Sequence, residues 1–155
     1  MADESFLLFL KELIRTNQIP QGALCFEVTE TAAVSNLAEA TRFMQELRRA
    51  GCLFALDDFG SGVSSFGYLR SLPIDFLKID GTFVRDVHRD SVDRAIVESI
   101  RNVARQLQVR TIAEFVESEE ALRQIVDLEI DLVQGYALAR PRPPLHPLEE
   151  LESAA

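Results

Sequence analysis

The apolar positions along the chain alternate between two periods, one typical of helices and one typical of strands. Apolar residues at helical spacing between Phe6 and Ile14 predict an amphipathic helix, which ends before a proline and a glycine in the segment 18–22. In the segment 24–29 that follows, large apolar residues occupy every second position, and Glu27 falls on the other face. The chain therefore begins with a helix and a short strand, and Glu27 points away from the large apolar face of that strand.

The same helix and strand unit recurs along the rest of the chain. Helices are expected at 34–47, 65–72, 92–107 and 118–126, and strands at 52–56, 75–79, 110–113 and just before Gln134. Helices that alternate with strands are typical of parallel strands joined by helical crossovers. The sequence therefore predicts an α/β fold with five parallel strands and intervening helices. We expect Val92 and Val126 to face inward, and a further helix at 145–151 after a proline-rich segment.

Length and charge limit the kind of domain and the kind of partner. The chain has 155 residues, whereas a complete (β/α)8 barrel usually needs about 250. Sixteen Lys and Arg residues against 25 Asp and Glu residues give a net charge of −9, which repels DNA and RNA polymers. No run of about 18 apolar residues could span a bilayer, and no secretory signal pattern is present. We expect a single soluble, cytoplasmic domain; a membrane anchor in upstream domains is compatible with this expectation.

Each expected strand ends in polar or charged residues. These are Glu27, Asp57 with Asp58, Lys78 with Asp80, Glu114, and Gln134. A single acid in such a position is more often a helix N-cap or a solvated loop residue. However, the carboxyl ends of parallel strands converge on one rim, where several carboxylates repel one another unless cations lie among them. Oxygen ligands without His or Cys favour Mg²⁺ or Mn²⁺, and two such ions about 4 Å apart activate water against a phosphodiester.

Five short strings occur in the order and spacing of the signature blocks of EAL domains. They are FEVTE from Phe26, DDFGSG from Asp57, LKIDG from Leu77, AEFVE from Ala113, and QGY from Gln134 with Arg140-Pro141 after it. Over essentially its whole length the chain resembles the EAL-domain family of cyclic di-GMP phosphodiesterases. The resemblance implies a (β/α) TIM-type barrel that hydrolyses cyclic di-GMP to linear pGpG with Mg²⁺ or Mn²⁺.

The resemblance also implies roles for the residues at the rim. Glu27 and Asp57 resemble metal ligands, and Asp58 resembles the acid that adjoins or bridges the second metal. Lys78 resembles the lysine that holds the attacking water or a phosphate oxygen, and Glu114 the general base. The resemblance therefore implies a two-metal site in the complete domain.

Four further residues are assigned supporting roles by the resemblance. Gln134 is implied as a polar residue next to the substrate, with Asp80 and Glu117 completing the surroundings of the ligands. Glu30 resembles the glutamate that fixes the loop after Asp58, and that loop couples metal, substrate and dimerisation in the family. A homodimer and cyclic di-GMP are therefore the expected partners.

The chain also departs from the family pattern. Val63 stands where the loop commonly has a tyrosine, and Phe115 where a glycine is commonest; neither change removes a ligand. EAL domains begin with a strand that ends in Glu-Ala-Leu and, one unit later, a strand with an Asn, and both the Glu and the Asn bind metal. This sequence contains neither strand. We therefore expect residues 1–155 to form a single, N-terminally truncated EAL domain, an incomplete barrel whose unpaired edges favour pairing with a second copy.

Different functions remain open at this point. The leading hypothesis is a cyclic di-GMP phosphodiesterase, with this chain inactive or weakly active alone because two metal ligands are absent. The alternative is a degenerate module that binds cyclic di-GMP, or dimerises and signals, without turnover. A generic sugar-phosphate barrel enzyme does not account for an acidic rim without histidine.

Overall fold

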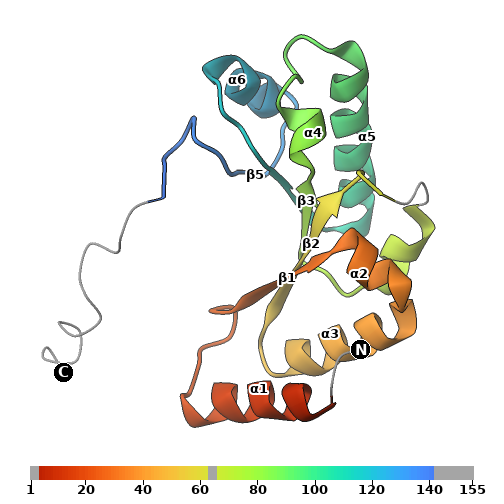
Figure 1. Cartoon of the computed structure of the whole chain (residues 1–155), viewed down its shortest axis with the longest axis vertical. Helices are drawn as coiled ribbons and strands as arrows, with labels where there is room; N and C mark the ends of the chain where they lie inside the picture. The colour runs from red at the N-terminus through yellow and green to blue at the C-terminus, as the bar shows by residue number, and fades with distance from the viewer. Residues whose placement is uncertain (1–3, 63–65, 142–155) are drawn as a thin grey trace, which may run out of the picture.

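The computed structural model describes residues 4–62 and 66–141, which fold as one parallel sheet flanked by helices (Figure 1). The helix expected at 145–151 lies outside the described residues. In chain order the elements are α1 (Glu4–Thr16), β1 (Cys25–Thr29), α2 (Glu30–Ser35), α3 (Leu37–Arg49), β2 (Leu53–Phe59), the 3-10 helix η1 (Phe66–Ser71), β3 (Phe76–Ile79), α4 (Gly81–Val84), α5 (Ser91–Leu107), β4 (Arg110–Ala113), α6 (Glu119–Asp127) and β5 (Leu132–Val133).

The sheet has the strand order β1-β2-β3-β4-β5, and every neighbouring pair is parallel. Each strand thus pairs with the next one along the chain, as helical crossovers in one direction require. Within the described residues β1 and β5 each pair with a single strand, so the sheet does not close on itself. The prediction of an α/β fold with five parallel strands in an incomplete barrel is confirmed.

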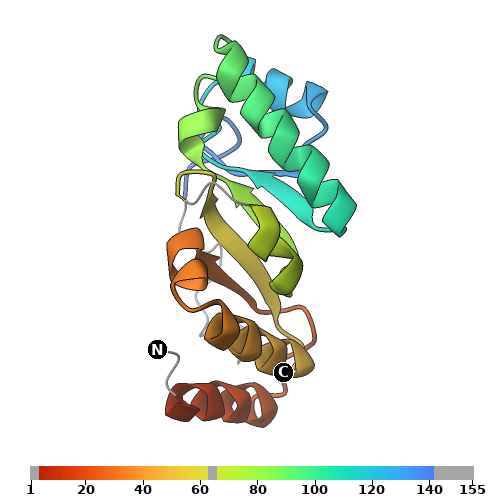
Figure 2. The ribbon, with the colours of Figure 1, turned by 90° about the vertical axis from the view of Figure 1, so that its right-hand side faces the viewer.

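The two faces of the sheet have different neighbours. Helices α2, α3 and α5 lie over one face, as the view in Figure 2 shows, and they contact β1, β2, β3 and β4. Side chains that point to this face form the core, among them Phe54, Leu56, Leu77 and Ile79. Because side chains alternate along a strand, the residues between them point to the other face. The open face therefore receives the polar residues near the carboxyl ends of the strands.

Two helices turn different residues toward the core than the sequence predicts. Val92 in α5 is 64% exposed and Val126 in α6 is 61% exposed, so the expectation that both face inward is wrong. In α5 the buried positions are Val97, Ile100 and Ala104. Successive helical residues are rotated by about 100°, so a neighbour of a buried position such as Val126 points well away from the core.

No helix in the described ranges is long and apolar enough to cross a membrane.

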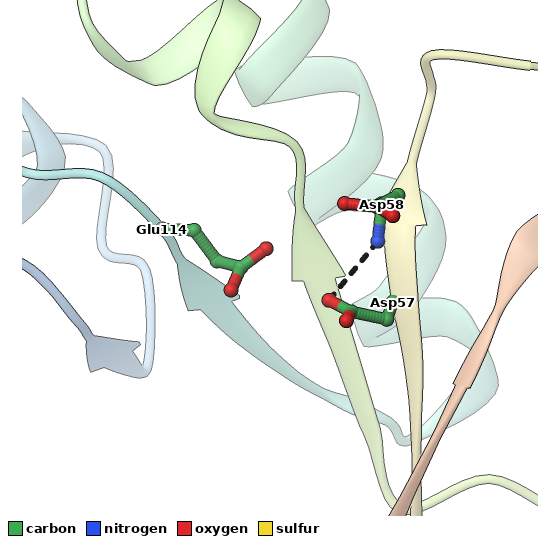
Figure 3. A group of neighbouring side chains, drawn as sticks. All are labelled: Asp57, Asp58 and Glu114. Carbon is green, nitrogen blue, oxygen red and sulfur yellow. Dashed lines mark hydrogen bonds between the residues drawn. The ribbon is translucent and has the colours of Figure 1, made fainter.

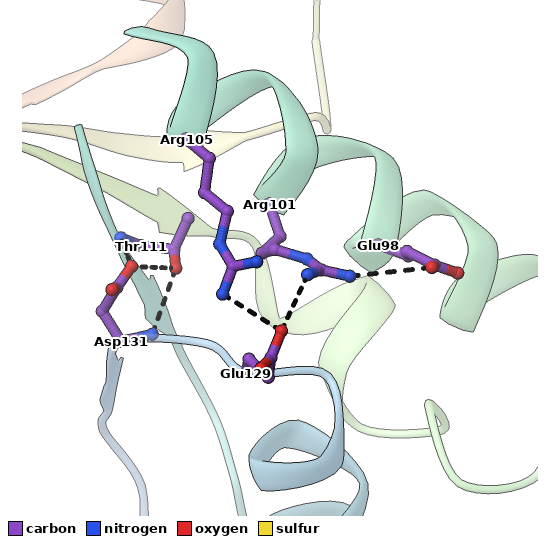
Figure 4. A network of polar contacts seen from close by, with 6 residues as sticks. All are labelled: Glu98, Arg101, Arg105, Thr111, Glu129 and Asp131. Carbon is purple, nitrogen blue, oxygen red and sulfur yellow. Dashed lines mark hydrogen bonds and ion pairs between the residues drawn. The ribbon is translucent and has the colours of Figure 1, made fainter. Parts of the chain in front are cut away.

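An aspartate before each of two strands bonds that strand to the preceding one. The carboxylate of Asp75, next to β3, accepts the Phe54 N–H of β2 at 2.9 Å. Before β5, the Asp131 carboxylate accepts both the N–H and the hydroxyl of Thr111 in β4, each at 2.7 Å (Figure 4). Burial raises the pKa of Asp131, but these hydrogen bonds outweigh it and hold the pKa below its ordinary value. The two carboxylates therefore fix where β3 and β5 begin beside their neighbours.

The turn after α6 is attached to α5 by charge. The Glu129 carboxylate lies 3.2 Å from the Arg101 guanidinium and 3.1 Å from that of Arg105, both on α5 (Figure 4). Arg101 is mostly buried and also lies 3.6 Å from Glu98. These contacts hold the segment that leads into β5 against the helix layer.

Replacement of Asp131 by alanine tests the bond at the start of β5. Thr111 is 1% exposed, so its N–H and hydroxyl would lose their acceptor without gaining water. We expect the free energy of unfolding, measured by urea denaturation, to fall by about 1–3 kcal/mol. The matched control is Asp127→Ala, an exposed acid at the end of α6, for which we expect a change within about 0.5 kcal/mol. Equal effects of the two substitutions would contradict this account.

Candidate metal centre at the carboxyl ends of the strands

One lysine joins the side chains of three strands at the rim. The Lys78 ammonium of β3 lies 3.0 Å from Glu27 of β1, 2.9 Å from Asp57 of β2 and 2.9 Å from Glu114, which follows β4. The Lys78 side chain is 4% exposed, whereas that of Glu27 is about half exposed. The structure thus brings together four of the residues singled out from the sequence, one buried ammonium and the three carboxylates around it.

The charges of this group do not balance. Burial lowers the pKa of Lys78, but its hydrogen bonds with Asp57, Glu114 and Glu27 outweigh burial and raise the pKa, so the ammonium stays charged. Burial raises the pKa of Glu114; the nearby Lys78 ammonium opposes this and the Asp57 carboxylate adds to it. One ammonium faces three carboxylates, which leaves the centre negative when all are ionised.

A distortion of β2 brings Asp58 to the same place. In a regular strand Asp57 and Asp58 would point to opposite faces. The pairing of β2 with β3 shifts between Leu56 and Phe59, and Asp58 has φ 55°, a left-handed conformation. The Asp58 N–H donates to the Asp57 carboxylate at 3.1 Å. A bulge of this kind changes the direction of a side chain, and here it turns Asp58 toward the centre.

Three carboxylates consequently approach closely enough to share a cation. One oxygen each from Asp57, Asp58 and Glu114 lies within 4.8 Å of the other two (Figure 3). Burial raises the pKa of Asp58, as do the negative charges of Asp57 and Asp80. Such a group of oxygens fits a hard divalent cation, because the cation would offset the repulsion between the carboxylates, which adds to the effect of burial on this pKa.

Two other predicted residues act on the backbone around the centre. Glu30, which is 2% exposed, accepts the Gly60 N–H at 3.2 Å and the hydroxyl of Tyr68. Asp80 accepts the Thr82 N–H at 2.7 Å and is the N-cap of α4. Glu30 therefore contacts the segment after Asp58, and Asp80 has the ordinary capping role of a strand-end acid.

Gln134 and Glu117 lie beside the carboxylate centre. They line a hollow of about 480 Å³ together with Glu114, Phe115 and Tyr136. Both side chains are exposed, and among the described contacts neither bonds to the Lys78 group. Glu114 is thus shared between the carboxylate centre and the hollow next to it.

Sequence reasoning gave no role to the aromatic residues around the rim, although Phe115 stood out as a departure from the family pattern. Phe115 has φ 52°, the conformation that glycine adopts most easily, which explains why glycine suits this position. Its ring packs against Gly81, and the Arg85 guanidinium lies 4.9 Å from the ring centre. Tyr68 and Tyr136 were given no role either. An aromatic residue just after an expected strand, where the family most often has glycine, was the available signal at Phe115; Tyr68 gave none.

The tripeptide Glu-Ala-Leu does occur in the sequence, but not in a strand. Residues 120–122 lie in α6, and Glu120 lines a separate hollow with Arg85 and His88. This glutamate is therefore not part of the carboxylate centre.

Substitution of Lys78 by methionine tests the cation at the centre. Three carboxylates would then face one another without their shared ammonium. In the presence of a chelator we expect the free energy of unfolding to fall by about 3–5 kcal/mol, as when one partner of a buried ion pair is removed. Lys11→Met is the control, because Lys11 pairs with Glu46 at 2.9 Å near the surface; we expect a loss below about 1 kcal/mol. Similar losses for the two variants would show that Lys78 does not hold the rim together.

Comparison with known proteins identifies the family. The EAL domain family model matches residues 1–141. The cyclic di-GMP phosphodiesterase PdeB of Shewanella oneidensis is 45% identical over 135 residues, which are 87% of this chain and 16% of PdeB. The chain thus spans less than a fifth of the length of this relative.

Solved structures share the fold. The PaMucR phosphodiesterase in complex with c-di-GMP matches with a TM-score of 0.85 and 32% identity, over 97% of this chain and 59% of that one. Klebsiella pneumoniae BlrP1, in a complex with manganese and cyclic di-GMP, matches with a TM-score of 0.81 and 30% identity, over 89% of this chain and 35% of that one. From the family match over residues 1–141 and the likeness to PdeB, this chain belongs to the EAL domain family.

Proposed function

We propose that this chain forms the C-terminal portion of a metal-dependent phosphodiesterase domain that hydrolyses cyclic di-GMP to linear pGpG. The observation that carries the proposal is the group of three close carboxylates, Asp57, Asp58 and Glu114, at the carboxyl ends of parallel strands. Two of them, Asp57 and Glu114, contact the Lys78 ammonium. The name of PdeB and the cyclic di-GMP complexes of PaMucR and BlrP1 support the same substrate.

The donor set suits Mg²⁺ or Mn²⁺. All three close carboxylates offer oxygen, which hard divalent cations prefer, and the centre carries more negative than positive charge. We propose Asp57 and Asp58 as ligands, and Glu27 on the neighbouring strand as a further ligand of a two-metal site. When bound, such ions lower the pKa of a water molecule and neutralise charge on the phosphodiester.

Lys78 and Glu114 would act directly on the reacting groups. The raised pKa of Lys78 keeps its ammonium protonated, so it can hold the attacking water or a phosphate oxygen by donating hydrogen bonds. The raised pKa of Glu114 makes its carboxylate a stronger base for the proton of that water. Glu114 also lines the 480 Å³ hollow with Gln134 and Glu117, which would contact the substrate beyond the phosphate.

The supporting residues complete the proposal. Glu30 would hold the segment after Asp58, and Asp80 would hold the start of α4 beside it. A cytoplasmic location and the absence of DNA or RNA partners stay predictions.

We expect the chain alone, with excess Mn²⁺, to hydrolyse cyclic di-GMP at a rate orders of magnitude below that of a complete EAL domain. The family's further Glu and Asn ligands lie on strands that this sequence does not contain. Their loss would weaken both the activation of water and the neutralisation of charge by the metal, each of which lowers the activation free energy by several kcal/mol. Chromatography of pGpG measures the rate. Asp57→Asn should abolish turnover, whereas Asp86→Asn, which removes an exposed partner of Arg89, should leave it unchanged.

Three results would count against this account. Turnover as fast as that of a complete domain would contradict the weak activity. Turnover that persists in both variants, or that is lost in both, would contradict the role of Asp57.

A second function, binding of cyclic di-GMP or signalling without turnover, is favoured by the open sheet, which leaves Glu27 half exposed at the edge strand. Calorimetry with cyclic di-GMP distinguishes the two functions. Saturable binding without formation of pGpG would support the second.

We also propose that the chain forms a homodimer. The β1 and β5 edges each lack a second described neighbour, and α1 exposes Leu8 and Phe9. We expect sedimentation at micromolar concentration to show a dimer. Cys25→Lys on β1 should dissociate it if the edges pair, and Phe66→Glu should do so if the contact lies near the segment after Asp58. A stable monomer of the unchanged chain would contradict the proposal.

A further inference from the structure

We propose that Tyr68 is a positioning residue for the metal centre. Its hydroxyl holds the Glu30 carboxylate, and this carboxylate holds the backbone that turns Asp58 toward Asp57 and Glu114. The link to metal and turnover rests on the function proposed above, whereas the link from Tyr68 to the backbone is measurable without either.

Within the described part of the chain, Glu30 is a buried carboxylate that accepts hydrogen bonds and meets no cation. None of the ion pairs in residues 4–62 and 66–141 includes Glu30. Its two oxygens accept from different donors: one from the Tyr68 hydroxyl, and the other from the Gly60 N–H at 3.2 Å. A buried carboxylate without a cation depends strongly on each hydrogen bond. Loss of the Tyr68 hydroxyl would therefore leave one oxygen without its donor and free the carboxylate to rotate.

The backbone that Glu30 holds has positive φ at two positions, and at Asp58 this conformation is unfavourable for a residue with a side chain. Asp58 has φ 55° and Gly60 has φ 100°, and the β2 and β3 register shifts in the same segment. A Cβ on Gly60 would lie 2.9 Å from the Phe83 ring, so the segment also packs tightly on its other side. A non-glycine residue stays in the left-handed region only where its surroundings fix it. The bond from the Gly60 N–H to Glu30 is one such constraint.

Tyr68 is itself firmly placed. It lies on η1 next to the buried Leu69, and the ring of Phe66 at the start of η1 lies 5.6 Å from that of Phe59. Burial and the hydrogen bond to Glu30 raise the pKa of Tyr68, so the phenol remains a donor. The direction of the Asp58 carboxylate thus depends on contacts that run from η1 through Glu30 to β2.

Tyr68→Phe removes the hydroxyl and keeps the ring. We expect the Gly60 amide to exchange with solvent faster than in the unchanged chain, as measured by NMR hydrogen exchange. We also expect Mn²⁺ affinity, measured by electron paramagnetic resonance of the free ion, to fall roughly 10- to 100-fold, as for other residues that orient metal ligands.

Two further variants separate positioning from general stability. Thr111→Val removes a buried hydroxyl that contacts Asp131 near the start of β4, and should lower thermal stability without changing Gly60 exchange or Mn²⁺ affinity. Glu30→Gln should reproduce the effect of Tyr68→Phe. If both act through one chain of contacts, the double variant should lose less Mn²⁺ affinity than the product of the single losses.

The outcomes are separable from those of the proposed function. Unchanged Gly60 exchange in Tyr68→Phe would overturn the inference, as would Mn²⁺ losses that simply multiply in the double variant. If the unchanged chain binds no Mn²⁺, the proposed function fails, and Gly60 exchange alone decides the role of Tyr68: faster exchange supports it, and unchanged exchange overturns it.

Discussion

The rim of this domain depends on the ammonium of Lys78. Its transfer from water into the protein is unfavourable, and it is stabilised because Glu27, Asp57 and Glu114 approach it from three other strands. The same ammonium stabilises those carboxylates, which otherwise repel one another. Parallel strands make this possible because they deliver all their carboxyl ends to one side. The interaction that holds the strand ends together therefore also maintains the negative charge that suits a metal.

The remaining geometry comes from a departure from regular strand structure. Alternation alone would place only one of Asp57 and Asp58 at the centre, and the bulge in β2 brings the second. Glu30, from the preceding strand and helix unit, accepts the Gly60 N–H and so holds this left-handed backbone in place. One buried acid, Glu30, thus holds the backbone, whereas Asp57, Asp58 and Glu114 form the centre.

The sequence predicts the strands well because each contains apolar residues and carries a polar or charged residue near its end. It also places Lys78 and Glu114 at the rim, since strand ends are visible in the pattern. It does not predict that Val92 is exposed, because the helical period shows that a helix has an apolar face but tertiary packing decides which residues at the edge of that face are buried. Nor does it predict the bulge at Asp58 or the bond between Tyr68 and Glu30. Both depend on backbone conformation and on contacts between distant residues, which no local pattern encodes.

Lys78 and Gln134 differ chemically but occupy equivalent places, because each follows at the same distance along the chain an aspartate that fixes the start of its strand. Asp75 bonds β3 to β2, and Lys78 follows three residues later; Asp131 bonds β5 to β4, and Gln134 follows at the same spacing. Once an aspartate fixes where a strand begins, the position three residues on is carried to the rim whatever its side chain. The ammonium of β3 thus has a neutral amide as its counterpart after β5. The ammonium and the carboxylates that contact it therefore lie between β1 and the end of β4. The hollow next to them is lined by the acids Glu114 and Glu117, but also by the Gln134 amide and the rings of Phe115 and Tyr136, an aromatic surface on which a base of the proposed substrate can stack.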